Sequence, residues 1–279
     1  MGLVTVVATV IAIVLSMLLV ATLLCIRRDQ WATTIDEMPD RLNKAAPYVS
    51  LLVIVLLVNT AIRPFGPDIS WLINLNITGT IYSIEGNFVV WLQQFVRPEL
   101  TAYFSFIYIY GYVFLLVFPL LAYLALERQR YLQELTIAYA ANYTIGLFGY
   151  LLFVAFGPRN LLPDLVQQPM YDFYPQMKLL TSAVNANTNV FPSLHTSLAA
   201  TVMLFAWRTR VNYPRWVPIA MVIGASVIVS TMYLGIHWLI DVIAGIGLAY
   251  VSYLLGIHLA ARWELSIPKP RWLAQHFGR

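Results

Sequence analysis

Charged residues are scarce in this 279-residue chain, and cysteine is almost absent. Asp, Glu, Lys and Arg make up 11% of the residues, whereas 60% are hydrophobic. A soluble domain averages about a quarter charged residues. The lone cysteine, Cys25, has no second cysteine for an internal disulfide and matches no metal-binding spacing. These shortages argue against a soluble globular fold, a disulfide-rich scaffold and a cysteine-based metal site.

The chain contains instead a series of apolar runs, several of them about 20 residues long and able to cross a hydrocarbon core of about 30 Å. In lipid every backbone polar group needs an internal partner, so such runs indicate helices. The alternating pattern of a membrane barrel is absent from the sequence. We therefore predict an all-α, polytopic membrane bundle of about six or seven transmembrane helices. The predicted spans are residues 3–26, 46–62, 102–126, 135–156, 191–207, 216–236 and 238–261.

The basic residues predict how these spans are oriented. With the N-terminus outside and the C-terminus inside, 13 of the 17 lysines and arginines fall on the inside. Cytoplasmic loops carry such an excess of positive charge. The formal charge of +4 is therefore a topology signal, and we expect no nucleic-acid partner. Two long loops, 63–101 and 157–190, are expected outside. The four outside basic residues are Arg63, Arg97, Arg159 and Lys178.

Polar residues from three distant segments are predicted to meet at that outer face. The fourth span ends at "FGPRN", which contains Arg159. The fifth begins at "VFPSLHTS", which contains Ser193 and His195. The last two spans meet at "IHWLID", which contains His237 and Asp241. Hairpin connections return all three segments to one side of the membrane.

The histidine and the carboxylate of the last segment lie one helical turn apart. His237 and Asp241 therefore share a helix face. A carboxylate there can accept the proton of one ring nitrogen and leave the other nitrogen as a nucleophile. A pair that only joins two helix ends fits the same spacing.

The other two segments suit anion binding. Pro192 is compatible with a first helical turn, and the amides of Ser193, Leu194 and His195 could face an anion; an ordinary capped helix start fits equally. Arg159 could bind phosphate bidentately or extend from the span to the interface. Together the segments supply an anion site, a nucleophile and a general acid for phosphoryl transfer. Two histidines and an aspartate could also ligate a metal ion, but the nearby arginine and helix N-terminus favour an anion.

The segments "PSLH" and "HWLID" resemble the second and third signatures of the type-2 phosphatidic acid phosphatase superfamily, usually P-S-G-H and S-R-x5-H-x3-D. The resemblance covers roughly residues 100–260, with motifs at 157–160, 191–197 and 230–241. It implies that His237 attacks phosphorus and becomes phosphohistidine, with Asp241 orienting it. It also implies that His195 protonates the leaving oxygen and that no metal or cofactor is needed. The residues implied to bind the phosphoryl oxygens are Arg159, Ser193 and Leu194.

The chain departs from the usual signatures at several positions. Leu152 and Asn160 stand where the first signature has a lysine and a proline, and Thr231 stands where the third has an arginine. Leu194 replaces a glycine. "PSLH" with fewer arginines is similar to the branch that contains inositol phosphorylceramide synthase. That similarity implies either hydrolysis or transfer of a phosphorylated headgroup to an alcohol, and a smaller positive charge would suit a phosphodiester.

We therefore expect an integral membrane enzyme, in the cell membrane, that acts on a lipid phosphate at the extracytoplasmic face. Residues 1–45 would form a first span and a basic cytoplasmic loop, 46–262 the catalytic domain and 263–279 a basic cytoplasmic tail. The loop 157–190 could cover the substrate or be a plain connection. Its candidate substrate residues are Asp164, Tyr171, Asp172 and Tyr174.

Two other functions remain open on sequence grounds. The same cluster could bind or transport a lipid phosphate without chemistry, but a transporter typically places polar residues at mid-membrane. Asn142 and Thr144 are the notable polar residues inside a predicted span, and the stronger groups gather at one face. A structural membrane protein with a degenerate site is disfavoured by the intact set of two histidines and an aspartate.

Overall fold

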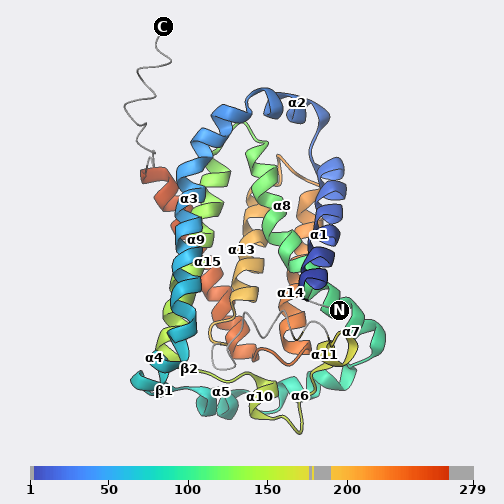
Figure 1. The fold of residues 1–279 in the computed structure, drawn as a ribbon, viewed down its shortest axis with the longest axis vertical. Helices are drawn as coiled ribbons and strands as arrows, with labels where there is room; N and C mark the ends of the chain where they lie inside the picture. The colour runs from blue at the N-terminus through green and yellow to red at the C-terminus, as the bar shows by residue number, and fades with distance from the viewer. Residues whose placement is uncertain (1–2, 176–177, 179–189, 264–279) are drawn as a thin grey trace.

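The structure, a computed structural model, is an all-α bundle in which seven helical segments lie side by side (Figure 1). It describes residues 3–175, 178 and 190–263. The predicted tail lies outside the described residues except for Trp263. Within the described part, the long helices are α1 (Leu3–Cys25), α3 (Met38–Ile62), α7 (Pro98–Phe106), α8 (Tyr112–Leu124), α9 (Arg130–Leu152), α13 (Leu194–Arg208), α14 (Trp216–Tyr233) and α15 (Leu239–Arg262).

Six of the described helical stretches are long and apolar enough to cross a membrane, and the fold is the predicted polytopic bundle. The segment between α7 and α8 is the π-helical η3 (Ile107–Gly111), so the three together form one crossing. The predicted span 191–207 corresponds to α13, which has 15 residues and rises about 22 Å at 1.5 Å per residue. It is shorter than predicted because Ser193 ends the extended chain as its N-cap.

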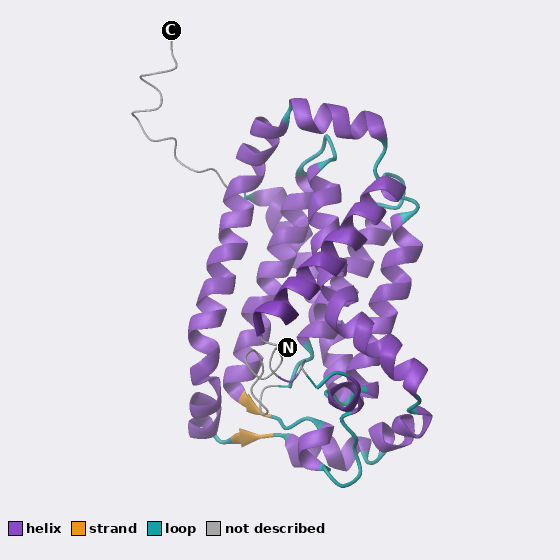
Figure 2. Cartoon of the chain, turned by 45° about the vertical axis from the view of Figure 1, so that its right-hand side comes forward, coloured by secondary structure: helices purple, strands orange, loops and turns teal. Residues whose placement is uncertain are grey.

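The described parts of both long loops lie at the same end of the bundle, called here the loop end, and Figures 1 and 2 show them there from two directions. A two-residue parallel pairing joins them, with Leu75 opposite Phe153. The opposite end carries α2 (Arg28–Asp36). The loop-end elements are η1 (Arg63–Phe65), α4 (Gly66–Ile73), β1 (Leu75–Asn76), α5 (Thr78–Glu85), α6 (Phe88–Leu92), η2 (Gln93–Phe95), β2 (Phe153–Val154), α10 (Pro158–Leu161) and α11 (Pro169–Phe173).

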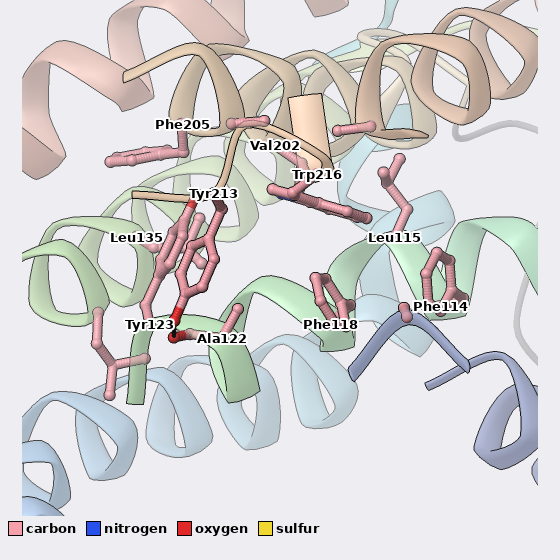
Figure 3. Packing of buried hydrophobic residues seen from close by; sticks show 14 of the residues in the cluster. Phe114, Leu115, Phe118, Ala122, Tyr123, Leu135, Val202, Phe205, Tyr213 and Trp216 are labelled. Atoms are coloured by element: carbon pink, nitrogen blue, oxygen red, sulfur yellow. Dashed lines mark hydrogen bonds between the residues drawn. The ribbon is translucent and has the colours of Figure 1, made fainter. Parts of the chain in front are cut away.

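The apolar core is formed mainly by α1, α3, α8, α9, α13 and α14, and Figure 3 shows part of it. The rings of Phe118 and Trp216 lie 4.5 Å apart between centroids, and both side chains are fully buried. Tyr213 donates to the carbonyl of Ala122 at 2.6 Å, because a buried hydroxyl needs a partner. This packing fixes α13 and α14, which carry or precede the two histidines.

Of the two polar residues noted inside the fourth predicted span, Asn142 binds a neighbouring helix and Thr144 is exposed. Asn142 is fully buried, and its amide donates to the carbonyl of Ala138 and to the hydroxyl of Thr201. Ser197 donates to the Asn142 side-chain oxygen. These bonds join α9 to α13, and hydrogen bonds of this kind hold membrane helices together.

Candidate active site

His237 and Asp241 lie on either side of the start of α15. The Oδ2 atom of Asp241 is 3.4 Å from Nδ1 of His237, at the long end of hydrogen-bond geometry. It also accepts the backbone N–H of Trp238 at 2.9 Å. Asp241 is fully buried and His237 is 4% exposed. The arrangement directs Nδ1 toward the carboxylate and leaves Nε2 on the other side of the ring.

Thr231 anchors the segment that carries His237. It stands at the position where the third signature usually has an arginine. The carbonyl of Thr231 accepts the N–H groups of Ile236 and His237 at 3.0 and 3.1 Å. The Thr231 hydroxyl turns back to the carbonyl of Ile228 at 2.7 Å. Thr231 is fully buried, so this position supplies a backbone anchor and no charge.

His195, in the first turn of α13, lies beside His237. Their ring centroids are 6.4 Å apart. Tyr108 stacks on the His195 ring at 4.7 Å, and Tyr112 contacts it at 4.4 Å. The structure therefore brings the two predicted histidines together and holds one of them between tyrosines from η3 and α8.

The start of α13 differs from the expectation of three free amides. The Ser193 N–H already donates to the carbonyl of Asp241 at 3.1 Å. The Ser193 hydroxyl accepts the Thr196 N–H at 3.3 Å and donates to the Thr196 hydroxyl at 3.0 Å. Ser193 thus joins α13 to α15, and the expectation that its amide is free is wrong.

Arg159 reaches the same region through its backbone. Its N–H donates to the carbonyl of Gly235 at 3.1 Å, in the turn before His237. A Cβ on Gly157 would lie 2.4 Å from the carbonyl oxygen of Ile236, so a glycine permits this close approach. The Arg159 guanidinium donates to the Tyr171 hydroxyl at 3.3 Å and lies 5.0 Å from the centre of that ring.

The four candidate residues of the second loop separate into two groups. Tyr171 contacts Arg159, and Tyr174 packs against the buried cluster that contains Tyr108 and Ile236. Asp164 and Asp172 are exposed. Much of the predicted cover, residues 176–177 and 179–189, lies outside the described residues.

Two residues that the sequence did not single out lie at the site. Arg63, in η1, has its guanidinium carbon 5.4 Å from the centre of the Tyr150 ring; its only sequence signal was a basic residue at an outer span end. Glu85, at the end of α5, accepts the Ile240 N–H at 3.1 Å. Burial raises the pKa of the Glu85 carboxyl, and the charge of Asp241 adds to that rise. Nothing in the local pattern around Glu85 indicated this contact.

Comparison with protein families supplies the identity of the fold. A family model described as the PAP2 superfamily matches residues 82–255, more than half of the chain. The chain belongs to the PAP2 superfamily. The PAP2 match includes Glu85, Arg159 and both histidines, and it begins after Arg63. Searches of curated proteins and of solved structures found no match.

Membership and structure together define a class of protein. Its long apolar helices make it an integral membrane protein, and the PAP2 superfamily supports a phosphatase-type enzyme. Within the described residues, no group of three or more His, Cys, Asp or Glu side chains is placed to hold a metal ion.

Proposed function

We propose that the protein transfers the phosphoryl group of a lipid phosphate through a covalent intermediate on His237. The supporting observation is the spatial arrangement of three side chains. Buried Asp241 faces Nδ1 of His237, and the His195 ring lies 6.4 Å from the His237 ring between centroids. In such a set the carboxylate orients the first imidazole, the first imidazole acts as the nucleophile, and the second imidazole acts as the general acid.

In the first step, Nε2 of His237 attacks phosphorus while the bond from phosphorus to the leaving oxygen breaks. Protonated His195 gives its proton to that oxygen, so an alcohol leaves and phosphohistidine forms. In the second step, water or a lipid alcohol attacks phosphorus and gives its proton to His195, and the bond to Nε2 breaks. Asp241 stabilises the charge on the His237 ring in both steps. Arg159 binds the phosphoryl oxygens, whose charge grows in the transition state.

The acceptor determines whether the reaction is hydrolysis or headgroup transfer. The similarity to the inositol-phosphorylceramide-synthase-like branch favours an alcohol acceptor. Tyr108 and Tyr112, which enclose His195, provide an aromatic wall compatible with an organic acceptor.

The decisive experiment incubates the purified chain with a panel of ³²P-labelled lipid monoesters and diesters, with and without lipid alcohols. We expect release or transfer of label and an acid-labile phosphoprotein that is absent from His237→Ala. Label retained by His237→Ala, or turnover without any acid-labile phosphoprotein in a rapid quench, would refute the intermediate. Absence of turnover with every lipid phosphate, together with bound but unreacted lipid, would favour a binder or transporter.

We further propose that the loop end faces the outside of the cell membrane, as the excess of inside lysines and arginines predicts. Cys25 is buried and is the only cysteine, so a single new thiol can report orientation. Exposed Asp172 changed to cysteine should react with a membrane-impermeant maleimide in intact cells. Labelling only after lysis would reverse the proposed orientation.

A further inference from the structure

Arg63 approaches the start of α13 through one aromatic side chain. Its guanidinium lies over the ring of Tyr150 at 5.4 Å, and this geometry is a cation–π contact. Tyr150 is 3% exposed, and it packs in one buried cluster with Leu194. Arg63 thus lies across one tyrosine from the helix N-terminus that carries His195.

The positive charge of Arg63 acts on the reacting groups. It lies within electrostatic reach of His195 and of the Tyr108 hydroxyl. The charge of Arg159 also reaches Tyr108, which stacks on His195. The other two basic residues of the loop end, Arg97 and Lys178, are exposed. Of these four cations, Arg63 and Arg159 are therefore the two whose charges reach His195 or the tyrosine stacked on it.

A cation held at the edge of an apolar bundle is expensive unless it has a functional or structural partner. Arg63 is partly buried, at the end of the second predicted span. The positions that usually carry additional basic side chains in the resembled signatures are apolar or uncharged here: Leu152 is 41% exposed and Thr231 is fully buried. Apart from Arg159, the positive charge near the histidines therefore comes from outside the usual signature positions.

We propose that Arg63 is a second phosphate-binding residue of this site and sets its preference for a dianionic phosphomonoester. The proposal rests on the proposed phosphoryl transfer at His237. A monoester carries more negative charge than a diester, and the transferring group spreads charge over three oxygens in the transition state. In this proposal Arg159 and Arg63 both bind those oxygens. A site with both arginines suits the monoester better than the count of signature arginines alone indicates.

The test compares Arg63→Gln and Arg63→Lys with Arg97→Gln, which removes an exposed cation of the same end. For each full-length variant in detergent, KM and kcat are measured for a lipid monoester and a matched diester. The melting temperature is recorded with and without orthovanadate. We expect Arg63→Gln to weaken vanadate binding and raise the monoester KM by about tenfold or more, the size of a lost charge-assisted hydrogen bond. The diester KM should change less, and Arg97→Gln should match the wild type.

A purely structural Arg63 gives a different result. Arg63→Gln would then melt at a lower temperature but bind vanadate as Arg97→Gln does, and this outcome overturns the proposal. If Arg63→Gln does not fold, Arg63→Lys decides. Lysine keeps the charge over Tyr150 but loses planar two-point binding, so we expect an unchanged melting temperature with a raised monoester KM; an unchanged KM overturns the proposal. The wild type could also bind vanadate but turn over no lipid phosphate. If Arg63→Gln then bound vanadate more weakly, Arg63 would still be an anion-binding residue, and only the proposed reaction would be rejected.

Discussion

Glu85 accepts the backbone N–H of Ile240 at 3.1 Å, although 155 residues separate the two in the chain. The contact attaches α5 in the first loop to the first turn of α15. In the same turn Asp241 accepts the Trp238 N–H, so two carboxylates serve the amides that begin one helix. Acidic groups at a helix N-terminus satisfy unpaired N–H groups and interact favourably with the helix dipole. The first loop thereby positions the helix that carries Asp241.

Replacing Glu85 by alanine should destabilise the start of α15. Loss of a helix N-cap acceptor costs about 0.5–2 kcal/mol, and we expect a lower melting temperature together with a lower kcat. Glu99→Ala is the matched control, because Glu99 is an exposed acidic residue in the first turn of α7. Equal melting temperatures for the two variants would contradict a capping role for Glu85.

The same carboxyl should make stability depend on pH. Burial raises the pKa of Glu85 above its ordinary value of 4.5, so the folded state holds this proton more tightly than the unfolded state. Its contribution to stability is full below the ordinary value and is lost as pH rises through the raised pKa. The melting temperature of the wild type, compared with that of Glu85→Gln, should therefore fall as pH rises from the ordinary value through the raised pKa. A wild-type advantage that grows with pH would show that the sign is wrong.

Asp241→Asn should nearly abolish turnover while keeping the fold. The asparagine oxygen can still accept the Trp238 N–H, but the side chain no longer carries the charge that stabilises a protonated or phosphorylated His237. We expect kcat to fall by about 10²–10⁴-fold, measured with the preferred substrate. Asp68→Asn, at an exposed position in α4 of the same end, should behave as the wild type. Normal activity of Asp241→Asn would reject the assigned role.

Gly157→Ala should separate the segments that carry Arg159 and His237. The added Cβ would lie 2.4 Å from the carbonyl oxygen of Ile236, and relieving such overpacking costs about 1–3 kcal/mol. The expected result is a lower melting temperature and a raised KM. Gly79→Ala is the control, since a Cβ there meets no heavy atom within 4 Å. A Gly157→Ala variant with wild-type KM would show that the Arg159 segment is not required in this position.

The sequence predicted the bundle because its signals are local. Each span is a continuous apolar run, and the helices α1, α9 and α15 lie where those runs stand. The meeting of His195, His237 and Asp241 was also predictable, because consecutive spans return the chain to the same end. The site residues needed only correct topology to be placed together.

The remaining features depend on packing between segments that no local pattern connects. Arg63 and Glu85 reach the site from the first loop, whose sequence has no strong hydrophobic periodicity. The partner of the Ser193 amide is the carbonyl of Asp241, which belongs to another helix. A helix start read alone shows unpaired amides, and only the assembled bundle shows what occupies them.

The π-helical η3 determines the rotational phase between α7 and α8. On one side of it, Thr101 shares a hydrogen bond with the Tyr233 hydroxyl at 3.1 Å; on the other, Phe118 packs on Trp216. A π turn holds one residue more than an α turn, and each residue of an α-helix turns the chain by about 100°. Deleting one residue from Ile107–Gly111 would make the helix regular and rotate one half against the other. The number of residues in this crossing is therefore as constrained as their identity, and a shortened variant must give up either the packing beside Tyr233 or that on Trp216.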